Sequence, residues 1–419
     1  MIDYDRYFSR AGRALRESAI RKMGTVLAAS REVVSFAPGY PAQESFAWDA
    51  FRAIADDLLT ERGTEVLQYG PTRGYRPLVE AIQGIQQARG MRTGASEIVV
   101  TTGSQQGLYL VGRALLDEGD VVLVELPSYT GAITAFRTFG AELVGVQQDD
   151  DGVNLEDLDR TLVRVRAEGK RVKAVYVVPN FQNPTGLLIA RAKRRALAAW
   201  ADRRDVLIIE DDPYRELYFT DVTTEEDTRP IAADDPNGRT IYLSSFSKTL
   251  APGFRTAWIV APADIAAKVE LAKQAVDLCT SGFDQQMVYQ AMVRGVLAAQ
   301  GPKLRELYQR KRDVMVRALR EETGGGLTWI DPRGGFFLWA RLPEGLDADA
   351  LLERATAHGV IYVTGTAFFV DGSGSDYIRL SFSAPSEDRI REGVTRLGAA
   401  MRAEAEAAGA AASPANRIG

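Results

Sequence analysis

The segment Tyr242-Leu-Ser-Ser-Phe-Ser-Lys-Thr-Leu-Ala-Pro-Gly-Phe-Arg255 joins a strand-like run to a polar turn. The apolar, β-branched residues 240–243 lead into the turn, where Lys248 is flanked by the hydroxyl groups of Ser245, Ser247 and Thr249. Arg255 follows after a Pro-Gly break. A lysine amine can form a Schiff base with an aldehyde, and hydroxyl groups and a planar guanidinium can hold phosphate oxygens. The alternative is a surface turn with a solvated lysine, and this segment alone leaves both interpretations open.

A second phosphate-binding feature is predicted where a strand turns into a helix. The strand Glu97–Thr102 is followed by Gly103-Ser-Gln-Gln-Gly107 and a helical stretch over 108–116. Ser104 and Gln105 therefore lie at a helix amino terminus, where free backbone N–H groups and the helix dipole favour an anion. The alternative is that Ser104 is an ordinary N-cap.

The composition excludes several classes of protein. The chain has 419 residues, enough for two domains, and its net charge of −5 is spread over both signs, which argues against a nucleic-acid or anionic-membrane surface. With a single cysteine, Cys279, the chain cannot form an intrachain disulfide or a cysteine metal cluster. The single histidine, His358, is predicted to lie at the end of an amphipathic helix. No metal site is therefore expected. No apolar run is long enough for a membrane span, and the start lacks an apolar signal core. A cytoplasmic protein is the simplest expectation.

An α/β fold is predicted from the strand pattern. The run Val172–Val178 is almost continuously apolar, as expected for a parallel sheet covered on both faces. Similar strands are predicted at 120–125, 141–146 and 206–210. Towards the carboxyl terminus, strands at 327–330, 335–340 and 377–382, with a helix at 348–358, predict a smaller α+β domain covered by a helix over 387–404.

Further polar motifs follow these elements in a fixed order. They are Tyr69-Gly-Pro-Thr-Arg-Gly74, Thr101-Thr-Gly-Ser-Gln-Gln106, Pro179-Asn-Phe-Gln-Asn-Pro-Thr-Gly186, Glu210-Asp-Asp-Pro-Tyr214 and Arg379. With the Ser-x-Ser-Lys-x-x-x-Pro-Gly-x-Arg segment, this series resembles the class I and II aminotransferases of fold type I, which depend on pyridoxal 5′-phosphate (PLP). The nearest resemblance is to the kynurenine and 2-aminoadipate subgroup, with its broad-range aromatic and branched-chain relatives, and it extends from about residue 18 to about residue 395.

The resemblance implies a cofactor site for these motifs. Lys248 would hold PLP as an aldimine and later act as general base, while Ser104, Gln105, Ser245, Ser247 and Arg255 would anchor the phosphate. Asp211 would keep the pyridine nitrogen protonated, with Asp212 as its nearby competitor. The remaining cofactor contacts implied are Tyr129 stacked on the ring, and Asn183 and Tyr214 at the ring oxygen. The alternatives are a turn aromatic for Tyr129 and an Asx turn for Asn183.

The resemblance also implies how substrate binds and how the active site is completed. Arg379 would grip the substrate α-carboxylate in a bidentate fork, and Gly39 would lie against that carboxylate. Asn183 is implied as a substrate contact as well as a cofactor contact. Arg21 matches an arginine that binds a distal carboxylate, although it could be an ordinary charged position on an amphipathic helix. Tyr69 would reach the cofactor phosphate of a neighbouring subunit, which implies a homodimer with shared active sites, unless its ring packs within its own loop.

Three departures from the family pattern concern the cofactor or substrate wall. Arg255-Thr-Ala257 stands where relatives have Arg-x-Gly, and Thr364-Gly-Thr-Ala-Phe368 where they usually have Pro-Gly before a buried Phe. Tyr40 and Pro41 replace a commoner small or apolar pair after Gly39, so Tyr40 is a candidate substrate contact. These departures leave the cofactor prediction intact and put the substrate and the reaction outcome in question.

The implied fold is a large domain, with a mainly parallel seven-stranded sheet between helices, and a smaller α+β domain. We expect an N-terminal segment joining the small domain (1–45), a large PLP-binding domain (46–300), a small C-terminal domain (301–404) and a disordered tail (405–419).

The expected activity is transfer of an amino group between an L-amino acid and a 2-oxo acid, with 2-oxoglutarate as the expected acceptor. One alternative on the same scaffold is a PLP-dependent lyase, oxidase or replacing or cyclising enzyme. A second is a PLP-sensing transcription regulator, which would carry a DNA-binding domain before the region around Arg21, where only about 20 residues stand here. A third is an α/β binding module without a cofactor.

Overall fold

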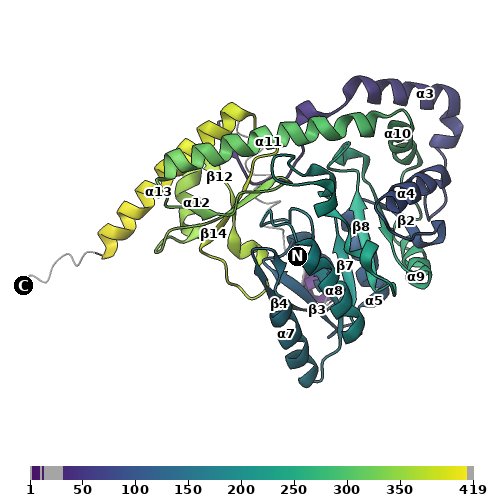
Figure 1. The fold of residues 1–419 in the computed structure, drawn as a ribbon, viewed down its shortest axis with the longest axis horizontal. Helices are drawn as coiled ribbons and strands as arrows, with labels where there is room; N and C mark the ends of the chain where they lie inside the picture. The colour runs from purple at the N-terminus through teal and green to yellow at the C-terminus, as the bar shows by residue number, and fades with distance from the viewer. Residues whose placement is uncertain (1, 10–11, 14–31, 413–419) are drawn as a thin grey trace, which may run out of the picture.

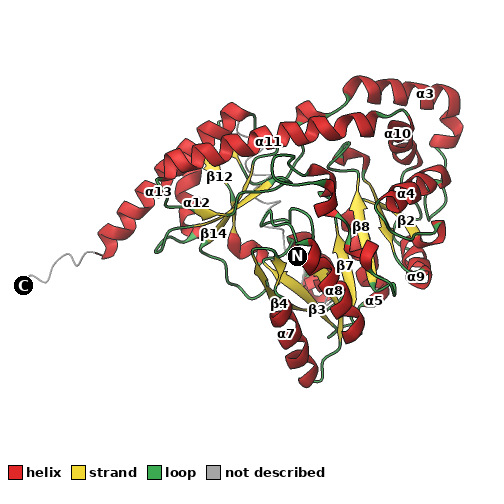
Figure 2. Cartoon of the chain, in the orientation of Figure 1, coloured by secondary structure: helices red, strands yellow, loops and turns green. Residues whose placement is uncertain are grey.

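The computed structural model describes residues 2–9, 12, 13 and 32–412, so Arg21 lies outside the described residues. Two sheets, each covered by helices, make up most of this part of the chain, and the long helix α11 (Val296–Thr323) extends from one to the other (Figures 1 and 2). Each sheet has its own buried apolar cluster.

The larger sheet has the strand order β2-β9-β8-β7-β6-β3-β4-β5. The strands are β2 (Ile98–Thr102), β9 (Thr256–Val260), β8 (Thr240–Ser245), β7 (Leu207–Asp211), β6 (Val172–Val177), β3 (Val121–Leu126), β4 (Glu142–Asp149) and β5 (Gly152–Val153). Pairings from β8 through β4 are parallel, whereas β9 is antiparallel to both its neighbours and β5 is antiparallel to β4. The seven-stranded, mainly parallel sheet that was predicted is therefore present, with β5 as a two-residue addition.

Helices cover both faces of this sheet because its central strands are apolar on both sides. Val122 and Val124 of β3 pack in a cluster with residues of α5, α6 and α9. Val121 and Leu123, which point to the opposite face, pack with residues of α7 and α8. A third cluster joins α3, α4 and α10 to the β2-β9-β8 end. The helices are α3 (Trp48–Val66), α4 (Arg76–Ala88), α5 (Ser104–Leu115), α6 (Thr130–Arg137), α7 (Leu155–Ala167), α8 (Arg191–Arg204), α9 (Ala263–Gln274) and α10 (Gly282–Val293).

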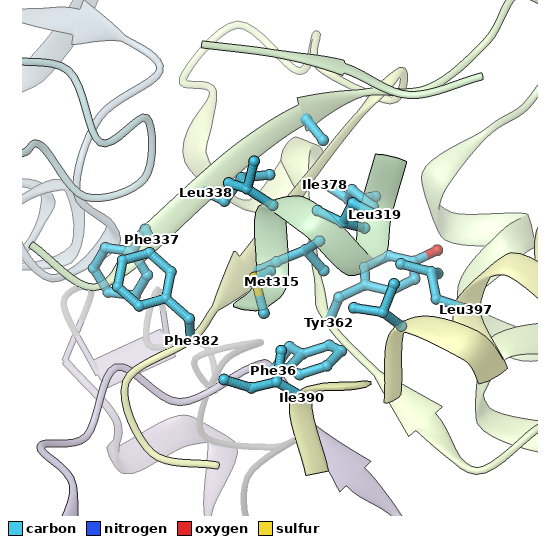
Figure 3. Packing of buried hydrophobic residues seen from close by; sticks show 14 of the residues in the cluster. Phe36, Met315, Leu319, Phe337, Leu338, Tyr362, Ile378, Phe382, Ile390 and Leu397 are labelled. Atoms are coloured by element: carbon cyan, nitrogen blue, oxygen red, sulfur yellow. The ribbon is translucent and has the colours of Figure 1, made fainter. Parts of the chain in front are cut away.

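The smaller sheet has the order β10-β11-β14-β13, and all its pairings are antiparallel. Its strands are β10 (Thr328–Trp329), β11 (Phe337–Arg341), β14 (Tyr377–Ser381) and β13 (Val363–Thr364). Leu338 and Ile378 pack against Met315 and Leu319 of α11 and Leu397 of α13 (Glu387–Ala412) (Figure 3). Helix α12 (Ala348–Ala357) lies in the same layer. The N-terminal β1 (Val34–Ser35) pairs in parallel with β12 (Val360–Ile361).

Two features differ from the sequence-based expectation. Strands β9, β12 and β13 are not among the predicted strands: the apolar run of β9 directly follows the Arg255 turn, and β12 and β13 are only two residues long each. Helix α13 continues to Ala412, so the prediction of disorder from residue 405 onward is wrong for residues 405–412. Alanine is the best helix former, and an alanine-rich stretch that directly continues a packed helix can stay helical without burying apolar surface.

Candidate active site

The site lies where the parallel strands of the large sheet end. Because β2, β3, β6, β7 and β8 run in the same direction, their carboxyl ends share one edge of the sheet, the usual position of a ligand site in open α/β sheets. The predicted site residues Ser104, Tyr129, Asn183, Asp211 and Ser245 all stand at or just after these strand ends.

Lys248 follows β8 and reaches across to the N-terminal segment. Its Nζ donates a hydrogen bond to the carbonyl oxygen of Gly39 at 3.0 Å and lies 5.6 Å from the centre of the Phe336 ring. The residue as a whole is partly exposed, but its amine is enclosed by protein atoms. This enclosure, reinforced by the positive charges of Arg255 and Arg379, lowers the pKa of Lys248 to about 8. A neutral amine is therefore accessible near neutral pH.

Asp211 ends β7 and presents one free oxygen. Its Oδ2 accepts a hydrogen bond from the hydroxyl of Tyr176 at 2.8 Å, whereas its Oδ1 is buried without a partner among the described residues. Burial raises the pKa of Asp211 to about 7, while the Tyr176 bond and the nearby charge of Lys248 oppose that rise. A cationic N–H beside Oδ1 would restore the charged form. Asp212, the competitor, is bound instead by Asn180 and Tyr242, so the structure favours Asp211.

The start of α5 and Arg255 form a candidate anion-binding cradle. Gly103 is the N-cap residue, with φ +82°, and Ser104 is the first helical residue, so Ser104 is not an ordinary N-cap. The Ser104 hydroxyl is buried and has no partner in the described chain. The guanidinium of Arg255 packs so closely on Gly103 that a Cβ there would overlap it. The neighbouring hydroxyls of Ser245 and Ser247 lie 2.7 Å apart.

Gln105 and Tyr129 meet at the beginning of α6. The Gln105 side chain donates to the carbonyl oxygen of Gly131 at 2.8 Å. Gly131 leaves space for both neighbours, since an added Cβ would overlap the Gln105 and Tyr129 side chains. Gln105 is exposed, and this hydrogen bond joins the first turn of α5 to the start of α6, directly after Tyr129.

Arg379 on β14 is buried, and it is held by the loop that follows β6 and by the N-terminal segment that follows β1. Its Nη1 donates to Asn183 Oδ1 at 2.7 Å, its Nη2 donates to the Ala37 carbonyl oxygen, and its Nε has no partner among the described residues. The guanidinium carbon lies 4.4 Å from the centre of the Phe337 ring and 5.0 Å from that of Phe368. Asn183 thus uses its oxygen for Arg379 and keeps its Nδ2 donor for another group.

Tyr214 completes the buried group beside Lys248. Its ring lies 5.9 Å from Lys248 Nζ and makes edge contacts with Phe336 and Phe337. Burial raises the pKa of Tyr214 above its ordinary value, so the phenol stays protonated and can donate a hydrogen bond.

Two of the predicted residues that the structure describes, Tyr69 and Tyr40, do not lie in this buried group. Tyr69 is 80% exposed and Tyr40 is 64% exposed, although the Tyr40 carbonyl oxygen accepts a bond from Ser383. Arg21 lies outside the described residues. Gly39, by contrast, packs against the ring of Phe337, which leaves no room for a side chain at that position.

Several residues of the site were not predicted. Tyr176 could have been suspected, because a phenol within the apolar strand β6 needs a buried partner. Phe337 and Phe368 carry no comparable sequence signal, since buried aromatic residues are common in any core.

The donors present fit the cofactor that the resemblance implies. Ser104 and Arg255 suit a phosphate, the free Oδ1 of Asp211 suits a protonated ring nitrogen, and the Lys248 amine suits an aldehyde. Among the described residues, no group of three His, Cys, Asp or Glu side chains could hold a metal ion. In residues 32–412, no helix is long and apolar enough to cross a membrane.

Comparisons with known proteins extend these observations. A family model described as aminotransferase class I and II matches residues 29–397. Aromatic-amino-acid aminotransferase 1 of Thermococcus litoralis is 40% identical over 404 residues, covering 96% of both chains. The 2-aminoadipate transaminase of Thermus thermophilus is 36% identical over 401 residues, covering 96% of this chain and 98% of its own. The crystal structure of Pyrococcus horikoshii kynurenine aminotransferase with PMP superposes with a TM-score of 0.91 at 38% identity, covering 96% of this chain and 98% of that one.

Proposed function

This chain belongs to the class I and II aminotransferases and is a PLP-dependent enzyme of amino-group transfer, and we propose that it acts on aromatic and 2-aminoadipate-type L-amino acids with 2-oxoglutarate as acceptor. The relatives are named as aminotransferases of aromatic amino acids, 2-aminoadipate and kynurenine. The observation in this chain that carries the proposal is the Arg379 guanidinium, buried between the Phe337 and Phe368 rings. An anionic carboxylate would pair with the guanidinium, while an aromatic side chain would find neighbouring ring surface.

The residues around the cofactor would each have a separate task. When bound, PLP supplies an electron-withdrawing ring that stabilises negative charge at the substrate Cα. Asp211 would hold a proton at the ring nitrogen, and Tyr214 and Asn183 would donate to the ring oxygen. Ser104, Gln105, Ser245, Ser247 and Arg255 would fix the phosphate, with Tyr129 against the ring face.

Lys248 would hold the cofactor at rest and move the proton during turnover. Its lowered pKa of about 8 leaves a useful fraction of neutral amine near neutral pH. The freed amine would take the proton from the substrate Cα. Arg379 would orient the α-carboxylate, and so decide which Cα bond is broken.

A homodimer with shared sites is part of the proposal. Trp48 at the start of α3, and Leu67 and Tyr69 just after its end, are 62%, 74% and 80% exposed, which is unusual for apolar and aromatic side chains. A second copy would cover them and bring Tyr69 to the partner's phosphate. Mixing Lys248→Ala with Tyr69→Ala protein should then restore activity that neither variant has alone. A cytoplasmic location stays a prediction from the cysteine content.

An amino-donor panel tests the proposed reaction. Purified protein, loaded with PLP, is given phenylalanine, tyrosine, kynurenine, 2-aminoadipate, leucine or glutamate, and the cofactor spectrum is followed through a single turnover. Transamination gives pyridoxamine phosphate and the matching 2-oxo acid, while unchanged aldehyde cofactor with another product would indicate a lyase or replacement enzyme. Lys248→Ala should lose activity and exposed Lys268→Ala should keep it. A preference for 2-aminoadipate that survives Arg21→Ala would exclude Arg21 as the distal-carboxylate residue.

A further inference from the structure

A buried ion pair lies directly behind the start of α5. Lys273, in the last turn of α9, is fully buried, and its Nζ lies 2.7 Å from Asp277 Oδ1. Asp277 follows the end of the helix and is one-quarter exposed. Fully buried lysines are rare in proteins and occur almost only in ion pairs. A lysine at this position does not contribute to a solvated surface, so a role of the pair is expected in the elements that it contacts.

The pair is hydrogen-bonded to both sides of the turn that carries Ser104. Asp277 Oδ2 accepts from the Thr102 hydroxyl at 2.7 Å and from Gln106 Nε2 at 2.6 Å. Gln106 Oε1 accepts from Lys273 Nζ at 3.0 Å and from the Thr102 backbone N–H at 2.8 Å. Thr102 ends β2 and Gln106 lies in the first turn of α5, so the network closes residues 103–105 from behind.

The charges in this network matter to an anion in front of it. Burial opposes the ionised form of Asp277, but bonds from Lys273, Gln106 and Thr102 lower its pKa overall. A lone carboxylate behind the cradle would repel a phosphate, and in a poorly solvated setting such repulsion is not fully screened. Lys273 cancels that charge while holding the same carboxylate in place.

We propose that Lys273 and Asp277 are positioning residues for the phosphate end of the cofactor: they fix the turn at residues 103–105, and Lys273 neutralises the carboxylate behind it. This proposal rests on the proposed phosphate cradle of Ser104 and Arg255. It assigns the pair a role in phosphate affinity and none in the chemistry at the substrate Cα.

The experiment compares PLP with pyridoxal, which lacks the phosphate. The cofactor is removed from wild-type protein, Lys273→Met and Asp277→Asn, and the Kd of each compound is measured by absorbance. In Lys273→Met the unpaired carboxylate of Asp277 should lower the affinity for PLP, relative to that for pyridoxal, by about tenfold or more. Asp277→Asn should lower the affinity for PLP relative to pyridoxal by a smaller factor, because this substitution loosens the turn without leaving an unpaired negative charge behind it.

Asp159→Asn is the matched control for general destabilisation. Asp159 also accepts bonds from two partners, Trp200 Nε1 at 2.9 Å and Arg204 at 2.7 and 2.6 Å, but it joins α7 to α8. The melting temperature of the Asp159→Asn protein should fall, while the ratio of its affinities for PLP and pyridoxal should stay that of the wild type. If Lys273→Met does not fold, Thr102→Val removes the 2.7 Å bond to Asp277 with little change of shape and should also weaken PLP selectively.

An unchanged ratio in Lys273→Met, or an equal change in Asp159→Asn, would overturn the proposal. Failure of the wild-type protein to bind PLP would instead contradict the proposed function, so the two failures can be told apart.

Discussion

Replacing Tyr176 with phenylalanine tests how the protein controls Asp211. The substitution removes one hydroxyl from a fully buried ring and with it the 2.8 Å bond to Asp211 Oδ2. The ring can keep its packing against Phe136, whose centroid lies 5.7 Å away. The perturbation is therefore almost entirely the loss of one hydrogen bond to a buried carboxyl group.

The size of the effect follows from that bond. A hydrogen bond to a charged group contributes about 1.5–3 kcal/mol, and about 1.4 kcal/mol corresponds to one pKa unit. Burial already raises the pKa of Asp211 to about 7, and Tyr176 opposes the rise. Without the bond, the pKa should rise further by about one to two units. At pH 8 the carboxyl group would then change from mainly ionised to half or more protonated, and it would pair less well with a protonated ring nitrogen.

The assay is the pH dependence of PLP binding to protein freed of cofactor. Affinity should fall on the acidic side as Asp211 takes up a proton, and this limb should move to higher pH by about one to two units in Tyr176→Phe. Tyr242→Phe is a matched control, because it removes a 3.0 Å bond to the neighbouring carboxylate, Asp212. Since the charge of Asp212 raises the pKa of Asp211, partial protonation of Asp212 can only move the limb to lower pH.

A shift of less than about 0.3 units in Tyr176→Phe would refute this reasoning, because it would mean that the Tyr176 bond contributes under about 0.4 kcal/mol. An equal upward shift in Tyr242→Phe would do the same, since the effect would then not be specific to Asp211.

Other predictions concern substrate binding, pH and the core. Arg379→Lys should lower kcat/KM by about 10²–10³-fold, because a point charge replaces a planar fork that can bind a carboxylate with two hydrogen bonds. The Kd for PLP should stay near the wild-type value. Steady-state kinetics measure the first effect, and a spectroscopic titration with PLP measures the second. Glu125, buried at the end of β3 and accepting bonds from Val178 N and Gln182, has its pKa raised to about 8 by burial. Glu125 by itself should therefore destabilise the protein without cofactor as pH rises from about 4 to about 8, since the unfolded carboxyl ionises first. Glu125→Gln should remove this contribution, so the stability of the variant relative to the wild type should increase over that pH range in urea titrations. Leu338→Ala in the small-sheet core should lower the free energy of unfolding by about 2–5 kcal/mol, and a loss below about 1 kcal/mol would contradict the packing in Figure 3.

Local motifs were enough to indicate the family and the cofactor, and they supplied the candidate residues for its site. Lys248, Asp211 and Ser104 stand in short strand-turn segments whose chemistry depends on neighbours within a few positions, so sequence alone could select them as candidates. The apolar strands likewise predicted the α/β class, because a parallel sheet covered on both faces requires them.

Tertiary structure decided which side chains support those residues. Tyr176 meets Asp211 only because β6 and β7 are parallel neighbours, and Arg379 meets Asn183 across 196 positions of sequence. Lys273 and Asp277 read as ordinary residues near the end of a helix until packing sets them behind Thr102 and Gln106. Strand register and the packing of distant segments set these distances, and neither is encoded in any single local pattern.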